Sequence, residues 1–305
     1  MTTTPDITTP SRPIPSPGIY YDIPASDYFA WDAVNASFLK RMAQSAAHAR
    51  WDADHPTPPT PAMIMGSCTH TAVLEPEKLE SRYCFADECA GIKASGEKCR
   101  NQGLILSHGR WYCGLHFKGK PCDELNGSEV VTAEALATAK SMAISVRNNR
   151  AARELLDAAR KEVCIVWVDH VTGVLCKARL DGYDATGLRI PDLKTCEDAS
   201  PDEFPRQIGD MGYDIQASFY LDAACSLNGE LHDAFYFIAV EKSAPFVTAV
   251  YKCHQGLIAL GRHRYRRLLM DYKWCVENKL WPGYHDHQIM PIETTRYFFE
   301  RESRK

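Results

Sequence analysis

Apolar and polar residues alternate along this 305-residue chain with periods that predict the strands of one sheet. Residues 163–168 (VCIVWV) are apolar on both faces, as expected of a strand that is buried between helices. Residues 176–194 predict a β-hairpin with a turn from Gly182 to Gly187. Pro191 breaks the strand rule in this hairpin, which favours an edge or a bulge there. Residues 233–241 and 246–253 predict two more strands.

Segments with a helical period surround these strands. A cap at Ser26 and an amphipathic helix that begins near Asn35 or Ser37 and reaches Trp51 are predicted first. The linker HPTPPTP, rich in proline, separates that helix from the next. The remaining predicted helices cover residues 62–75, 128–160 (one or two helices), 203–225 and 255–279. Together these elements predict an α/β core with a central mixed sheet flanked by helices.

Changes in composition divide the chain into five parts. Residues 1–17 are rich in Thr and Pro and predict a disordered tail. Residues 18–82 form an N-terminal helical part, and residues 83–127 form a cysteine-rich insertion. Residues 128–290 hold the core, and residues 291–305 form a C-terminal tail.

The hairpin carries the strongest candidate chemistry. Asp192 and Lys194 are two residues apart, so their side chains share one face of a strand. Asp181 closes the preceding strand, and the turn brings it back towards Asp192. Two carboxylates beside a lysine suit Mg²⁺ or Mn²⁺, hard cations that prefer oxygen ligands. The alternative for this segment alone is a solvated ion pair.

Three other segments carry candidate residues. Gln216 and Tyr220 lie four apart on one helix face, which is either a functional pair or a polar stripe. His70 shares a helical stripe with Gly66 and Leu74, a position more typical of a hydrogen-bonded core histidine. Glu162 begins a strand and is interpreted as an edge charge rather than an outer acid of the site.

The insertion concentrates cysteine and histidine. Cys89, Cys99, Cys113 and His116 form the best ligand set for a closed tetrahedral Zn²⁺ site, with Cys84, His108 and Cys122 as substitutes. A small segment without a hydrophobic core needs a structural metal ion of this kind to stay folded. The alternative is a group of free thiols.

The remaining composition restricts the function only in part. A formal net charge of −4 argues against a nonspecific basic coat for nucleic acid but allows a locally basic groove. The run RHRYRR at residues 262–267 makes Arg262 and Arg266 candidate phosphate contacts, or a solvated helix face. With no secretory signal and no apolar run long enough for a membrane span, a cytoplasmic protein without membrane contact is expected. Its twelve cysteines are therefore expected to be thiols and metal ligands.

These residues resemble a known family. Asp181, the run from Ile190 to Lys194 (IPDLK), and Gln216-x-x-x-Tyr220 are similar to the PD-(D/E)xK nuclease superfamily. The segment Gly66 to His70 (GSCTH), followed by Leu74-Glu75-Pro76, resembles more closely the RecE (exonuclease VIII) type of phage and prophage nuclease. The resemblance extends from about Gly18 to Trp281, apart from the cysteine-rich insertion. It implies a restriction-endonuclease-like fold.

The resemblance also implies an activity. A RecE-like enzyme would hydrolyse one strand of linear double-stranded DNA from its ends, 5′ to 3′, with Mg²⁺ or Mn²⁺. The metal would be bound by His70, Asp181, Asp192 and the Leu193 carbonyl, and Lys194 would orient or deprotonate water. Gln216 and Tyr220 would face the site. A homo-oligomeric ring and a single-strand annealing protein as partner are implied by the family only.

Ser37 has two interpretations. The resemblance places it near the 5′ phosphate of the DNA, whereas the sequence alone favours a serine that caps a helix.

Two rival functions remain open. One is a Cas4/AddB-like nuclease with an iron–sulfur cluster, although Cys196, Cys225, Cys253 and Cys275 are too scattered for its ligand spacing. The other is a noncatalytic protein that binds DNA or a partner on the nuclease scaffold, against which the intact acids and lysine argue.

Overall fold

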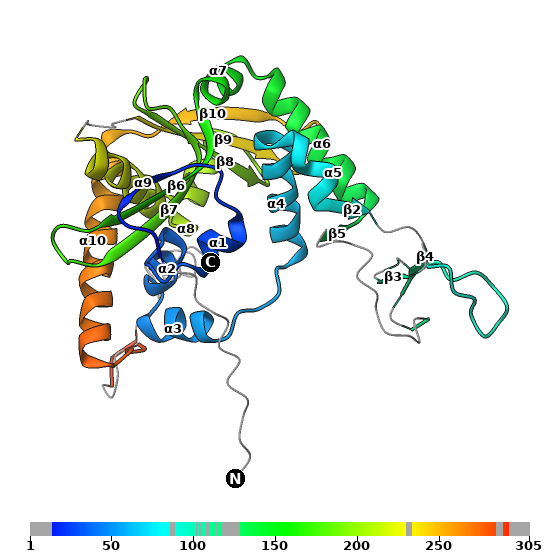
Figure 1. Ribbon diagram of the computed structural model, residues 1–305, viewed down its shortest axis with the longest axis horizontal. Coiled ribbons are helices and arrows are strands. Elements are labelled where there is room, and N and C mark those ends of the chain that lie inside the picture. The colour runs from blue at the N-terminus through cyan, green and yellow to red at the C-terminus, as the bar shows by residue number, and fades with distance from the viewer. Residues whose placement is uncertain are drawn as a thin grey trace, which may run out of the picture.

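The computed structural model describes residues 14–85, 89–101, 103, 105–107, 110–113, 115–116, 129–229, 234–284 and 289–292. The predicted tail at residues 1–17 lies outside this range up to residue 13, and most of the predicted C-terminal tail lies outside it as well. Figure 1 shows a layered α/β body with a small β-rich segment at one side.

Six strands form the centre of the body in two three-stranded ladders. The first ladder is antiparallel, in the order β1 (Gly18–Tyr20), β6 (Arg160–Val168), β7 (Leu175–Tyr183). The second has the order β10 (Thr248–Lys252), β9 (Ala234–Glu241), β8 (Arg189–Cys196), in which β8 and β9 are parallel. The predicted α/β class with mixed strand pairing is confirmed.

The predicted hairpin forms, but its two strands separate soon after the turn. An isolated bridge between Asp184 and Arg189 closes the turn, and β7 and β8 then belong to different ladders. Pro191 lies beyond this bridge and has no N–H to donate. The next free donor, the Leu193 amide, binds Asp181 Oδ2 at 2.7 Å. The Asp181 side chain thus joins β7 to β8 at a point where a backbone hydrogen bond between the two strands would otherwise be expected.

One face of the sheet is covered by helices from both ends of the chain. Its core contains Leu39, Ile165, Phe219 and Phe237, all fully buried. The helices on this side and next to it are α1 (Ala25–Ala30), α2 (Ala36–Met42), α3 (Ala46–Asp54), α8 (Phe204–Asp210), α9 (Tyr213–Asn228) and α10 (Gln255–Asn278). Figure 1 shows α10 along the outside of α9.

The helices α9 and α10 cross at Gly261, and only glycine fits there. A Cβ atom at this residue would lie 2.0 Å from the Asp214 carbonyl oxygen and 2.5 Å from Ser218 Oγ. The two helix backbones therefore approach each other more closely than any side chain allows.

The opposite face of the sheet packs on a second core. Leu193, Ile238 and Val240 contribute to it from the sheet, and Val73 and Met142 from helices. The helices here and beyond are α4 (Pro61–Leu74), η1 (Pro76–Lys78), α5 (Leu79–Arg82), α6 (Ala133–Asn148) and α7 (Arg150–Ala158).

Three predicted helix boundaries are wrong. The helix expected to reach Trp51 is broken after Met42, because Ser45 Oγ accepts the His48 N–H and starts α3. The helix expected over 203–225 is broken at Gly212, which has φ +62° and begins α9. The helix α1 begins after Pro24, and Ser26 does not cap it.

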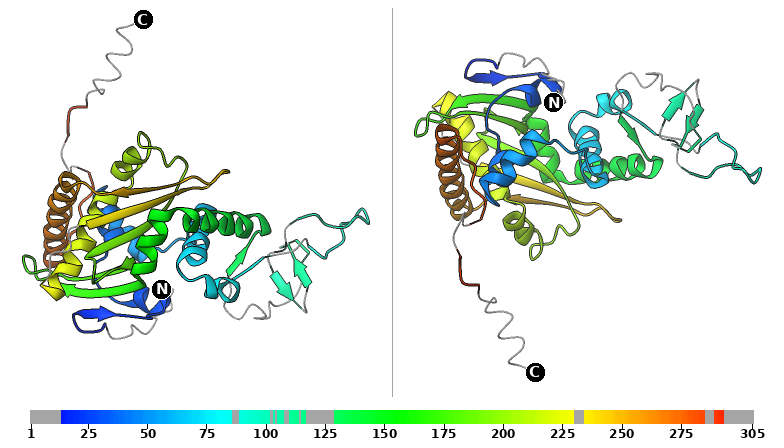
Figure 2. Two further views of the ribbon diagram at one scale, coloured as in Figure 1. Left: turned by 90° about the horizontal axis from the view of Figure 1, so that it is seen from above. Right: turned by 90° about the horizontal axis from the view of Figure 1, so that it is seen from below.

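A parallel pair of short strands brackets the insertion, with the second strand just beyond its predicted end. β2 (Tyr83–Phe85) pairs with β5 (Glu129–Val131), and between them β3 (Ile105–Ser107) pairs with β4 (Arg110–Tyr112). Figures 1 and 2 show the β3–β4 hairpin standing apart from the layered body. Among the helices that the structure describes, none has the length and apolarity needed to traverse a bilayer.

Candidate active site

Asp192 and Lys194 share one face of β8, as predicted, and form a buried ion pair. Lys194 Nζ donates to Asp192 Oδ2, and the Asp192 side chain is only 1% exposed. Burial raises the pKa of Asp192 to about 6, against the opposing effect of Lys194. Burial alone would lower the pKa of Lys194, but the charges of Asp192 and Asp181 raise it overall. Lys194 is therefore held as a cation.

Gln216 reaches the same carboxylate from α9. Its Nε2 donates to Asp192 Oδ1 at 2.8 Å, so both oxygens of this acid have a donor. Tyr220 lies one turn further along α9, and burial raises its pKa well above the usual value. The predicted Gln216 and Tyr220 pair thus faces the site rather than solvent.

Asp181 and His70 are brought together from β7 and α4. His70 Nδ1 lies 3.5 Å from Asp181 Oδ2, the oxygen that also accepts the Leu193 N–H. Burial would raise the pKa of Asp181, but His70 and Lys194 lower it overall. Burial likewise opposes a charge on His70, and Asp181 raises its pKa.

Glu162 is part of the same group, so its interpretation as an edge charge is wrong. The register that pairs Lys161 with Gly182 and Val163 with Leu180 places Glu162 opposite Asp181. Its side chain is 18% exposed and binds Arg179. Burial and the charge of Asp181 raise the pKa of this acid.

The backbone of Glu162 is also unusual. Its φ of +55° lies in the left-handed region, where a residue other than glycine is strained. Such strain concentrates at functional sites in proteins.

These residues offer a donor set that a divalent cation accepts. Ligand atoms of His70, Glu162 and Asp181 all lie within 4.8 Å of one another. Asp192 stands outside this group, with its two oxygens bonded to Lys194 and Gln216. Of the predicted metal ligands, the structure therefore joins His70 and Asp181 directly, and the Leu193 peptide lies beside them.

A cavity of about 760 Å³ opens over this group. Its lining includes Ser37, Gly66, His70, Asp181 and Tyr220. Ser37 lies in the first turn of α2 and is exposed, while Asn35 rather than Ser37 caps this helix by accepting the Phe38 N–H at 2.8 Å. The helix-cap interpretation of Ser37 is therefore wrong, and its hydroxyl is available to a molecule in the cavity.

Lys40 is a site residue that the sequence reasoning missed. Its Nζ lies 3.4 Å from Gln216 Oε1 and 5.4 Å from the centre of the Tyr213 ring. The aliphatic part of the Lys40 side chain packs on Gly212. A Cβ atom added to Gly212 would lie 3.1 Å from Lys40 Cγ. Burial and the charge of Lys194 lower the pKa of Lys40 to about 8. The three-residue spacing from Ser37 on one helix was the available signal.

Lys40 fixes the orientation of the Gln216 amide. Because the ammonium faces Oε1, the Nε2 group is left to donate to Asp192. Replacing Lys40 by methionine is therefore expected to lower kcat for the reaction that this site supports about 10- to 100-fold. Double-mutant kinetics with Gln216→Leu should show losses that do not add, because both changes release the same carboxylate oxygen. Additive losses, or an equal loss in the exposed control Lys273→Met, would contradict this role.

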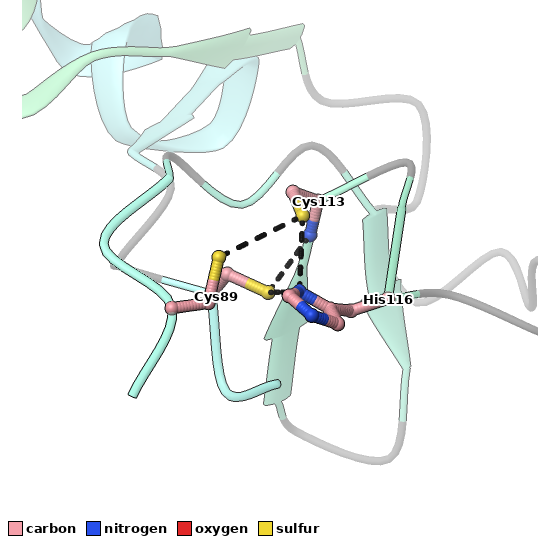
Figure 3. Close-up of side chains that lie close together, drawn as sticks. Cys89, Cys113 and His116 are labelled. Carbon is pink, nitrogen blue, oxygen red and sulfur yellow. Dashed lines mark hydrogen bonds between the residues drawn. The ribbon is translucent and has the colours of Figure 1, made fainter. Parts of the chain in front are cut away.

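The four predicted zinc ligands converge in the insertion. Ligand atoms of Cys89, Cys99, Cys113 and His116 lie within 4.8 Å of one another. Figure 3 shows the side chains of Cys89, Cys113 and His116 pointing toward one another. His116 Nδ1 is 3.4 Å from Cys89 Sγ and 3.3 Å from Cys113 Sγ. All three cysteines are buried. Three sulfurs and one ring nitrogen suit tetrahedral Zn²⁺.

Backbone amides support the thiolate form in this cluster. The amides of Gly91 and Cys113 donate to Cys89 Sγ at 3.3 and 3.2 Å. Burial opposes a charge on Cys113, but N–H groups of Leu115 and His116 lower its pKa to about 6. Cys84 lies apart, with its thiol donating to the Glu129 carbonyl at 3.7 Å. The other substitutes, His108 and Cys122, are outside the described residues.

The predicted phosphate contacts on α10 are paired with acid. Arg262 binds Asp222 through Nε at 2.9 Å and Nη2 at 2.6 Å, and Arg266 Nη2 lies 3.5 Å from the same carboxylate. Tyr265 also donates to Asp222. These arginines line a different cavity, of about 580 Å³, which does not include the His70 and Asp181 group.

Comparisons with known proteins agree with this geometry. Residues 35–289 match a family described as a PDDEXK-like domain of unknown function (DUF3799). A crystal structure described as a "putative exonuclease" from Eubacterium rectale superposes with a TM-score of 0.56 at 12% identity, covering 92% of this chain and 98% of that chain. A second crystal structure, of SSO0001, superposes with a TM-score of only 0.27 at 14% identity, covering 49% of this chain and 75% of that chain. No curated protein matches the chain.

Proposed function

The chain belongs to the DUF3799 family of PDDEXK-like domains, and we propose that it is a metal-dependent deoxyribonuclease that digests linear double-stranded DNA from its ends, 5′ to 3′. The observation that carries the proposal is the meeting of His70, Glu162 and Asp181 from three separate elements in the lining of one cavity, beside the buried Asp192 and Lys194 pair. Opposed charges that are buried together beside a cavity are typical of functional sites.

The acids and the histidine are the proposed metal ligands. Asp181, Asp192, His70 and the Leu193 carbonyl would hold Mg²⁺ or Mn²⁺, and Glu162 would add a further oxygen. To bind the cation, Asp192 would exchange one of its bonds to Lys194 and Gln216 for the metal. Bound there, the cation supplies Lewis-acid polarisation of a phosphoryl oxygen and a lower pKa for water.

The remaining residues position the reacting groups. Lys194, held as a cation by Asp192, would orient water and offset the negative charge that develops on the phosphate. Gln216 holds Asp192 in place, and Tyr220 lines the cavity beside His70 and Asp181. Ser37 would donate its hydroxyl to the 5′ phosphate at the far side of the cavity.

The biological setting is inferred from the resemblance of the sequence to RecE-type nucleases. We infer that the enzyme acts beside a single-strand annealing protein in phage-type recombination and assembles as a homo-oligomer. Linear duplex ends are its proposed substrate.

We also propose that Zn²⁺ is bound by the Cys89, Cys99, Cys113 and His116 cluster as a structural ion. Replacing Cys113 by serine should reduce the zinc content from about one ion per chain to none. Amide hydrogen exchange in residues 89–116 should accelerate at the same time, because the segment has little core of its own. Metal content measured by mass spectrometry tests this.

Cys84→Ser is the matched control for that variant, because its thiol lies outside the cluster. Zinc retained in Cys113→Ser, or lost equally in Cys84→Ser, would refute the ligand assignment.

The test of the proposed function uses linear duplex DNA labelled at one end, with either the 5′ or the 3′ ends blocked. Mg²⁺-dependent loss of label from DNA with free 5′ ends is expected, with no digestion in EDTA. Ser37→Ala should reduce the preference for a 5′ phosphate over a 5′ hydroxyl. DNA binding without digestion would instead favour a noncatalytic scaffold.

A further inference from the structure

Phe29 is an exposed aromatic residue at the mouth of the candidate active site. Its ring is 68% exposed, and it lines the same cavity as Ser37, His70 and Asp181. Most of its neighbours in that lining are polar or charged. A large apolar ring left in water beside a polar cavity has no role in the core of this chain.

Phe29 is nevertheless held in place by buried residues on both sides. Tyr28 and Trp31 are 4% and 6% exposed, and their rings meet edge to face with centroids 5.8 Å apart. The Phe29 ring packs edge to face against Tyr28 at 5.4 Å. The preceding and following side chains thus anchor the short helix α1 while the Phe29 ring faces outward.

A buried lysine, Lys177, holds the backbone of residues 28–31. Lys177 Nζ donates to the carbonyls of Tyr28 at 2.8 Å, Phe29 at 3.4 Å and Trp31 at 2.5 Å. Its side chain comes from β7, the strand that carries Asp181, and is 3% exposed. The position of the Phe29 ring is therefore coupled to the strand of the candidate metal site.

We propose that Phe29 is a stacking platform for a nucleobase of the DNA strand that enters the cavity. This proposal rests on the proposed nuclease function and names how the site receives its substrate. Arg82 and Arg179 in the lining are paired with Glu75 and Glu162, so a cation held by the acids would supply the positive charge for the phosphodiester backbone. Only an apolar face suits the base beside that backbone. Base stacking on an aromatic ring tolerates any sequence, as a nonspecific exonuclease requires.

The rigid mounting favours stacking over an incidental exposed residue. The backbone that carries the ring is already fixed by Lys177, so binding of a base does not have to order this segment. Loss of the ring should therefore weaken binding of a DNA end about 5- to 150-fold.

Stacking on Phe29 can be measured in a variant that does not hydrolyse DNA. In the Asp192→Asn background, duplexes carrying 2-aminopurine at successive positions from the 5′ end are titrated, and quenching of its fluorescence reports stacking on an aromatic ring. Phe29→Leu and Phe29→Ala should abolish the quenching at one position and weaken binding, whereas Phe29→Tyr should retain both. Trp274→Ala is the matched control, with an exposed ring on α10.

Equal quenching in Phe29→Leu and in the parent protein would overturn the platform. So would loss of self-association in Phe29→Leu with quenching unchanged, since the ring would then serve contact between copies. Digestion of linear DNA by the wild-type chain is measured in parallel. If the wild type digests DNA but Phe29→Leu leaves the quenching unchanged, only the stacking role of Phe29 is overturned. If the wild type does not digest DNA, the nuclease function itself is overturned.

Discussion

Replacing Asp192 by asparagine is expected to reduce the rate of DNA hydrolysis by about 10³-fold or more, since removing even one preorganised polar group from such a site costs 10²- to 10³-fold. The change removes a proposed metal ligand and the partner that holds Lys194 as a cation. It keeps the shape of the side chain, so the Gln216 contact at Oδ1 can persist. The loss should therefore appear in kcat rather than in DNA binding.

Lys194→Met tests the other half of the ion pair and should cost a similar factor. Glu197→Gln is the matched control, because this acid directly follows β8 and is 82% exposed. Its rate should equal that of the wild type. Steady-state digestion of labelled linear duplex, with circular dichroism to confirm folding, separates these outcomes. Full activity in Asp192→Asn would end the catalytic assignment.

Replacing Gly261 by alanine is expected to destabilise the fold by about 3 kcal/mol or more, the upper range for overpacking. The new Cβ atom would lie 2.0 Å from the Asp214 carbonyl oxygen, and backbone cannot rotate away as a flexible side chain can. The helices α9 and α10 would have to separate. Because α9 carries Gln216 and Tyr220, activity should fall with stability. A fall in Tm of about 5–10 °C is expected by calorimetry.

Gly209→Ala provides the comparison for that change. Gly209 lies within α8, and a Cβ atom there would meet nothing within 4 Å. The substitution should be neutral or stabilising by up to about 1 kcal/mol, from helix propensity alone. A Gly261→Ala protein as stable as Gly209→Ala would show that the two helices can adjust at little cost.

Much of the candidate site could be predicted from the sequence because local rules determine it. The two-residue period of a strand puts Asp192 and Lys194 on one face, and the four-residue period of a helix aligns Gln216 with Tyr220. The return of Asp181 follows from the turn. The clustering of Cys89 with His116 follows from composition, because so small a segment has few other ways to become ordered.

The residues that were misjudged or missed depend on contacts between distant segments. Glu162 looks like an edge charge until the register of β6 and β7 places it opposite Asp181. Lys40 looks like a solvated helix lysine until the gap over Gly212 lets it reach Gln216, 176 positions away. The helix break at Ser45 was missed because alanine-rich flanks predict continuation more strongly than one serine predicts a stop.

The bond between the Leu193 amide and Asp181 gives this protein a built-in reporter. Amide hydrogen exchange at Leu193 depends on whether the carboxylate oxygen stays with the backbone or turns to a bound cation. Titration with Mg²⁺ should therefore change the protection of this amide before any substrate is added. Occupancy of the proposed metal site could then be followed without DNA, by mass spectrometry of the one peptide that contains Leu193.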